Sequence, residues 1–166
     1  ATNAFDFAIN LGIAGAIDQE LSIGEMVEVE EDCFAEMGAE SPAGFLNLEA
    51  MGFSLIDNQP LFNIIKNNIQ SGFEIKTVKG ITVNRVHGMK PSIDRLGSEW
   101  PQAEVESMEG AAFFLSCKRA GISCLQFRAI SNYVEPRNRE AWNIPLALES
   151  LTKFIQNLIT NGFDLA

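Results

Sequence analysis

The chain has 166 residues, of which 46% are hydrophobic and 20% are charged, so we expect one domain, residues 1–166, with its own core. Its 22 acidic and 12 basic residues give a net charge of -10 without any lysine or arginine cluster, which excludes nucleic acid as a partner. Neither a membrane-length apolar run nor a secretion signal is visible, so we expect a cytoplasmic protein that does not bind membranes.

Strand-like segments dominate the first half of the chain. Residues Phe5 to Leu11 predict a buried strand that runs into GIAGA, a turn of small residues. Residues 26–30 predict a second strand with one solvent-exposed face, and residues 33–58 predict an irregular excursion, because glycine and proline are spread through them. Residues 59–71 carry apolar side chains at helical spacing and precede Gly72, so they predict a helix.

Strands and helices alternate in the second half. Strands are predicted over residues 73–86, as one long or two short strands, and 124–131, and helices over residues 92–98, 107–120 and 141–160. Ser107 is a candidate N-cap, Gly121 ends its helix, and Pro145 is tolerable only in the first turn of the last helix. This alternation predicts a three-layer α/β fold, in which ligands bind beyond the carboxyl ends of strands. Small or polar breaks at three such ends, GIAGA, HGM and SNY, are expected to converge on one pocket.

Cysteine and histidine usage does not suggest a metal site. Cys33, Cys117 and Cys124 lack CxxC spacing, and His87 is the single histidine. We therefore expect reduced, mostly buried thiols.

Four motifs follow one another along the chain: NLGIAGA, GITVNRVHG, VESMEGAAFF and FRAISNYVE. In this order they resemble the nucleoside phosphorylase and nucleosidase superfamily, most closely its futalosine hydrolase branch. The resemblance covers nearly the whole chain and implies an α/β/α fold with a central mixed sheet. It also implies cleavage of a purine N-ribosidic bond, a small-molecule purine nucleoside as substrate, no metal or organic cofactor, and a homo-oligomer.

The Met-Glu motif of the superfamily matches Met108 and Glu109. By the resemblance, Glu109 stabilises the positive charge that develops on the ribose and accepts hydrogen bonds from its hydroxyls, while Met108 packs under the sugar. A helix N-terminus favours the ionised carboxylate, although in isolation an acid at this position more often serves only the helix dipole. Glu106 fits a solvated acid at a strand end at least as well as a ligand contact, so we leave it out of the predicted site.

The residue beside the departing purine is implied to be Asn132. An asparagine can accept a hydrogen bond from N7-H and donate one to a 6-oxo oxygen, which suits hypoxanthine. Family members that cleave adenine nucleosides carry aspartate here, so the resemblance implies a 6-oxopurine base. In isolation, an asparagine at a strand end more often caps a turn.

The GIAGA segment lacks the GxGxxG spacing of dinucleotide sites, and by the resemblance it lines the ribose side of the pocket through Ile13, Ala14 and Gly15. Phosphorylases commonly place a serine where this chain has Ile13, which cannot donate a hydrogen bond to phosphate; this favours hydrolysis. Arg128, inside a strand, is expected to be buried and structural. The remaining implied site residues are a base-binding strand end and an aromatic residue near the substrate: His87, Gly88, Met89 and Trp142. A structural role for His87 and a place in the core for Trp142 fit the sequence equally well.

Family members begin with a further strand and loop that supply a second glutamate, which activates water. This chain opens at ATNAFDFAINLGIAGA, so we expect that unit to be absent. The predicted function is hydrolysis of futalosine or a close 6-oxopurine nucleoside, releasing hypoxanthine on the route to menaquinone. The alternatives are a phosphate-dependent purine nucleoside phosphorylase and a non-catalytic nucleoside-binding module.

Overall fold

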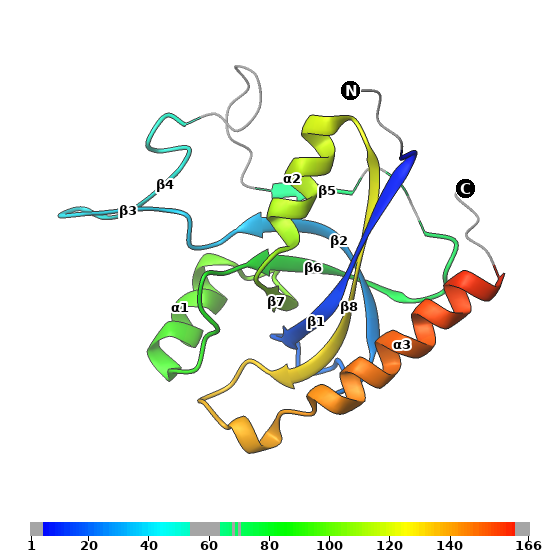
Figure 1. Ribbon diagram of the computed structural model, residues 1–166. Helices are drawn as coiled ribbons and strands as arrows, with labels where there is room; N and C mark the ends of the chain where they lie inside the picture. The colour runs from blue at the N-terminus through cyan, green and yellow to red at the C-terminus, as the bar shows by residue number, and fades with distance from the viewer. Residues whose placement is uncertain (1–4, 54–63, 68, 70, 162–166) are drawn as a thin grey trace.

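The computed structural model describes residues 5–53, 64–67, 69 and 71–161. Its main sheet contains β1 (Phe7–Ala16), β2 (Met26–Phe34), β5 (Ile64–Lys66), β6 (Lys76–Thr82), β7 (Val105–Ser107) and β8 (Ser123–Tyr133). The strand order is β5-β2-β6-β7-β1-β8 with both parallel and antiparallel pairs, and the sheet curls until β2 also pairs with β8 (Figure 1). A separate hairpin of β3 (Gly38–Ser41) and β4 (Gly44–Asn47) projects from this body.

Helices cover both faces of the sheet. They are α1 (Lys90–Glu99), α2 (Gly110–Ala120) and α3 (Ile144–Asn161), with a 3₁₀ turn at Arg139–Ala141. Alternate residues of β8 point to opposite faces: Cys124 and Ile130 share a core cluster with Phe114 of α2, whereas Leu125 and Phe127 pack against Phe154 of α3. The predicted α/β class with a mixed central sheet is therefore confirmed.

The first strand is longer than predicted, and GIAGA is not a turn. It forms the second half of β1, which lies parallel to β8 from Phe7, opposite Ser123, to Ala16, opposite Tyr133. The register shifts between Ala14 and Gly15. Small residues fit here because β8 places large polar side chains against them: a Cβ on Gly12 would lie 3.2 Å from Arg128 Nη1.

The helix predicted over residues 59–71 is wrong where the structure describes it. Residues 64–66 form β5, antiparallel to β2, with Ile65 buried and Ile64 exposed, the alternation of a strand. Residues 59–63, 68 and 70 lie outside the described residues. The predicted irregular stretch 33–58 is also partly wrong, since it begins in β2 and contains the β3–β4 hairpin; its residues 54–58 are not described.

Most of the later elements are confirmed, with one shifted boundary. Strands β6 and β8 and helices α1 and α3 occupy the predicted places, and Pro145 is the second residue of α3. Gly121 ends α2 with a φ of 66°, where glycine is favoured. Ser107 is not an N-cap, because it belongs to β7; the helix starts at Gly110, after Glu109.

Cys33, Cys117 and Cys124 are buried thiols that form no disulfide with one another, as expected. Within the described ranges, no helix has both the length and the apolar character that crossing a membrane requires.

Candidate active site

The carboxyl end of β1 meets the end of β8 at Gly15, which lies opposite Asn132. A Cβ on Gly15 would lie 3.1 Å from Asn132 Nδ2 and 3.5 Å from Glu106 Cγ. The missing side chain therefore allows the amide of Asn132 and the carboxylate of Glu106 to approach the same point of the backbone from neighbouring strands.

Asn132 is buried and its amide is held in one orientation. Its Oδ1 lies 2.8 Å from the Ser131 hydroxyl, and its Nδ2 donates to the Tyr133 carbonyl at 3.0 Å. The same Ser131 hydroxyl lies 3.1 Å from the carbonyl of Ala14 on β1. An amide has two lone pairs and two N–H groups, so these contacts leave one of each for a ligand.

Glu106 is not the solvated acid that the sequence suggested. It is 3% exposed, because β7 lies between β1 and β6, and it accepts a hydrogen bond from the His87 backbone N–H at 3.1 Å. Its second oxygen lies 2.8 Å from His87 Nδ1. Burial raises the pKa of Glu106, and the hydrogen bonds from His87 lower it. On the far side of the ring, His87 Nε2 lies 3.8 Å from Glu36 Oε1.

Two further loops join this cluster. The carbonyl of Gly88 accepts a hydrogen bond from the Arg137 backbone N–H at 3.0 Å, and the Arg137 guanidinium lies 5.8 Å from the ring of Trp142. The next residue, Asn143, donates its backbone N–H to the carbonyl of Ser131 at 2.8 Å. Trp142 and the segment after His87 are thus tied to the strand end that carries Asn132. Met89, in contrast, is 70% exposed at the start of α1.

Glu109 and Met108 lie directly after β7, where the chain enters α2. Both side chains are exposed, and Glu109, in the N-cap position, makes no capping hydrogen bond with its side chain. Burial lowers the pKa of Arg128, while the charges of Asp32 and Glu109 oppose this effect. Among the described residues, two buried side-chain polar atoms lack a partner: Ser107 Oγ and Arg128 Nε. Ile13 is half-buried on β1, opposite Ala129.

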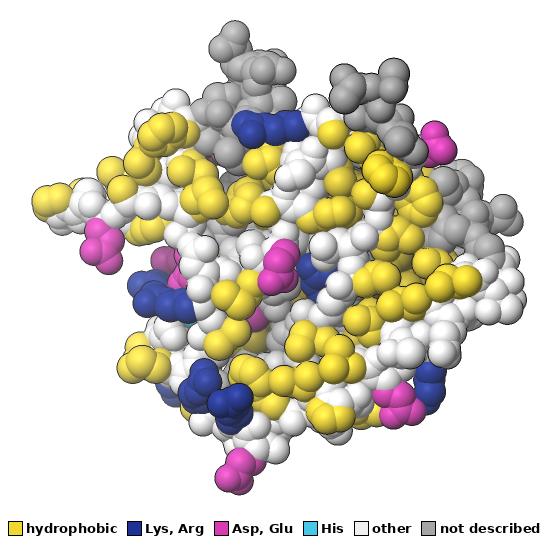
Figure 2. All heavy atoms as spheres, in the orientation of Figure 1, with side chains coloured by type: hydrophobic (Ala, Val, Ile, Leu, Met, Phe, Trp, Pro, Cys, Tyr) yellow, Lys and Arg dark blue, Asp and Glu magenta, His cyan; other side chains and the backbone are white. Residues whose placement is uncertain are grey.

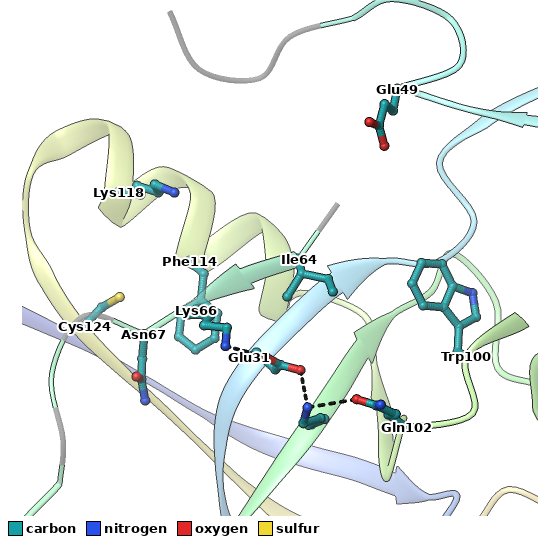
Figure 3. A pocket seen from close by; sticks show the side chains of 11 residues that line it. Glu31, Glu49, Ile64, Lys66, Asn67, Trp100, Gln102, Phe114, Lys118 and Cys124 are labelled. Atoms are coloured by element: carbon teal, nitrogen blue, oxygen red, sulfur yellow. Dashed lines mark hydrogen bonds and ion pairs between the residues drawn. The ribbon is translucent and has the colours of Figure 1, made fainter. Parts of the chain in front are cut away.

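Two cavities of the described part of the chain border this region. One of about 840 Å³ opens beside β2, β5 and β6, and contains none of the predicted site residues (Figure 3). There, Glu31 forms ion pairs of 3.1 Å with Lys66 and 2.9 Å with Lys79. A second cavity of about 660 Å³ includes His87 together with Arg95 in its wall, on the far side of the Glu106 pair.

Sequence comparison agrees with the motifs. The sequence model of the phosphorylase superfamily matches residues 6–161. Futalosine hydrolase of Acidothermus cellulolyticus is 34% identical and is aligned over 91% of this chain and 63% of its own length. The futalosine hydrolases of Streptomyces coelicolor and Thermus thermophilus are 31% and 30% identical, over 93% and 96% of this chain and 65% and 72% of their own lengths. The chain thus spans about two thirds of the length of these relatives.

Two solved structures illustrate the shared fold. The 5'-methylthioadenosine/S-adenosylhomocysteine nucleosidase of Neisseria meningitidis, in complex with methylthio-immucillin-A, has a TM-score of 0.73 at 15% identity, over 97% of this chain and 72% of that one. Futalosine hydrolase of Helicobacter pylori has a TM-score of 0.73 at 17% identity, over 95% and 69%. The match of the superfamily along residues 6–161, together with this fold, leads to one conclusion: the chain belongs to the phosphorylase superfamily.

Proposed function

We propose that the protein hydrolyses the N-ribosidic bond of futalosine, or of a close 6-oxopurine nucleoside, and releases hypoxanthine. The observation that carries this proposal is 30% to 34% identity, over more than nine tenths of the chain, to three proteins named futalosine hydrolase. The chemistry of the site residues supports the same reaction.

Glu109 serves the sugar in this proposal. Its carboxylate is exposed where the chain enters α2, so it is free of burial and accessible to a ribose. As the glycosidic bond breaks, positive charge develops on the ribose, and a fixed carboxylate stabilises that charge. Met108, exposed beside it, supplies an apolar surface for the sugar ring.

Asn132 serves the leaving base. Its free lone pair accepts from N7-H and its free N–H donates to the oxygen at position 6, which selects hypoxanthine over adenine. The backbone of Ala14 and Gly15 lies beside it, and the loops of Gly88 and Trp142 are tied to the same strand end. We propose these segments, with His87 and Met89, as the walls of the base site.

Water rather than phosphate is the proposed acceptor, because Ile13 offers phosphate no hydrogen-bond donor.

We also propose a homo-oligomer in the cytoplasm, acting on the route to menaquinone. Apolar side chains cover much of the face in Figure 2, and the β3–β4 hairpin and its flanks expose Phe45 by 52% and Phe53 by 56%. Exposed apolar surface of this kind is typical of protein interfaces, which supports the proposed oligomer.

The proposed cytoplasmic location is supported by the cysteines, because buried thiols outside disulfides fit a reducing compartment.

Incubation with futalosine, inosine and methylthioadenosine, with and without phosphate, tests the proposal. We expect futalosine to release hypoxanthine in phosphate-free buffer, and chromatography of the released base measures this. Release of adenine without hypoxanthine would overturn the proposed substrate. Absolute dependence on phosphate, with ribose-1-phosphate as product, would instead identify a phosphorylase, and hypoxanthine binding in a calorimeter without turnover would identify a non-catalytic binding module.

A further inference from the structure

A cluster of polar side chains is buried beneath the first turn of α2. It consists of Asp32 on β2, Thr82 on β6, and Gln126 and Arg128 on β8, whose exposed fractions are 1%, 7%, 0% and 1%. Buried polar groups cost free energy unless they are hydrogen-bonded, and a charged pair costs more. None of the four has a role in the chemistry proposed above, so their presence in the core requires another reason.

Hydrogen bonds connect the four side chains in a line. The Thr82 hydroxyl donates to Asp32 Oδ1 at 2.8 Å, and Gln126 Nε2 donates to Asp32 Oδ2 at 3.0 Å. Arg128 Nη2 then donates to Gln126 Oε1 at 3.1 Å. Both oxygens of Asp32 therefore accept a hydrogen bond, and the amide of Gln126 bridges Asp32 and Arg128.

One end of this line holds the helix. The backbone N–H of Ala111 donates to Thr82 Oγ1 at 2.7 Å. First-turn N–H groups have no partner within a helix, and Glu109 provides no side-chain cap, so Thr82 performs this function from another strand. Gly110 lies directly on the cluster: a Cβ there would be 2.0 Å from Asp32 Oδ2 and 2.6 Å from Gln126 Oε1.

The other end of the line lies against β1, where a Cβ on Gly12 would be 3.2 Å from Arg128 Nη1, so the missing side chain makes room for the guanidinium. Burial lowers the pKa of Arg128, and the charge of Glu109 opposes this effect. The network thus packs against Gly110 and holds the backbone N–H of Ala111, and Glu109 is the residue directly before them.

We propose that Asp32, Thr82, Gln126 and Arg128 form a positioning network that fixes the first turn of α2 and so holds the Glu109 carboxylate in place at the sugar. This inference rests on the proposed function. Asp32 and Thr82 are positioning residues that do not touch the substrate. Their loss should therefore slow turnover while leaving the binding of the free base at Asn132 unchanged.

Three variants test the hydroxyl of Thr82. Thr82→Val keeps the shape and removes the hydroxyl, Thr82→Ser keeps the hydroxyl, and Thr152→Val removes an exposed hydroxyl that bonds the Leu148 carbonyl in α3. Since misplacing a catalytic group by about 1 Å can cost about a hundredfold in rate, we expect Thr82→Val to lower kcat for futalosine by about tenfold or more. The Kd for hypoxanthine, from calorimetry, should not change. Thr82→Ser and Thr152→Val should retain wild-type kcat.

A double-mutant cycle separates positioning from a general loss of stability. In a Glu109→Gln background, Thr82→Val should lower kcat no further than about twofold, because the group that it positions is already gone. If the reductions in kcat caused by Thr82→Val and by Glu109→Gln multiply in the double variant, Thr82 does not act through Glu109 and the inference is overturned.

Amide hydrogen exchange tests the anchoring without any turnover. Thr82→Val should speed exchange at residues 110–113, and Thr152→Val should not. Unchanged exchange at these amides would overturn the inference even in an active enzyme. If Thr82→Val speeds exchange but the wild-type protein cleaves no nucleoside, the anchoring is upheld and the proposed function is refuted. The failure of the inference and the failure of the proposed function are therefore distinguishable.

Discussion

Asp32 should make the stability of this protein fall as the pH rises. Burial raises the pKa of its carboxyl from 3.8 to about 6, although the hydrogen bonds from Gln126 and Thr82 and the charge of Arg128 lower it. Between these two values the folded chain holds a proton that the unfolded chain has released. The contribution of the protonated Asp32 carboxyl to the free energy of unfolding is therefore complete below pH 3.8 and is lost as the pH rises through about 6.

The magnitude follows from the shift. A rise of about two pKa units corresponds to roughly 3 kcal/mol, of which about 1.4 kcal/mol is lost between pH 5 and pH 7.5. This window avoids the sequence pI of about 4.5, where the protein is least soluble. Asp32→Asn removes the titration and keeps the size of the side chain, so its free energy of unfolding should lack this part of the pH dependence.

Urea unfolding followed by circular dichroism measures the effect. The free energy of unfolding of the variant minus that of the wild type should rise by about 1.4 kcal/mol from pH 5 to pH 7.5, and other titrating carboxylates cancel in this difference. Asp94→Asn, on the exposed surface of α1, is the control and should give a flat difference. A flat difference for Asp32→Asn as well would refute the raised pKa and the reasoning from burial.

Three substitutions address the site itself. Glu109→Ala should reduce kcat by about a hundredfold or more with an unchanged melting curve, since it removes the group that stabilises the charged sugar; an unaltered rate would exclude that role. Asn132→Asp should shift the ratio of kcat/KM for 6-oxopurine over 6-aminopurine nucleosides by about tenfold or more toward the latter, and a constant ratio would contradict base reading by this residue. Glu106→Leu should lower the free energy of unfolding by about 1 to 3 kcal/mol, because it leaves the buried backbone N–H of His87 without its acceptor, whereas the exposed Asp94→Asn should stay within about 0.5 kcal/mol; equal effects would show that the Glu106 pair adds no stability.

The elements that the sequence predicted well are those with a strong local signal. Strand β8 and helix α3 have long apolar patterns and clear ends, such as Pro145 in the first turn of α3. The helix expected over residues 59–71 failed where it is described because Ile64 and Ile65 fit either period, and pairing with β2 decides between them. GIAGA was misread because small residues signal a turn locally, whereas β8 makes them a strand.

The site residues stay a prediction, and this prediction extends only as far as the motifs. Glu109 and Asn132 are proposed because each belongs to a recognisable short segment. Glu106 was missed because its partner His87 lies 19 residues away, and nothing in the spacing shows that β7 is an interior strand. Asp32 was missed for the same reason, since its partners Thr82 and Gln126 are 50 and 94 residues distant.

The parallel pairing of β1 with β8 has a consequence for how the chain reaches its native state. Phe7 is paired with Ser123, so the edge of β1 that faces β8 has its partner only after β8 has been synthesised. Contacts between distant parts of a chain form slowly, because a long loop must close first. During synthesis this edge of β1 therefore remains unpaired until β8 follows, and an exposed apolar strand edge favours aggregation.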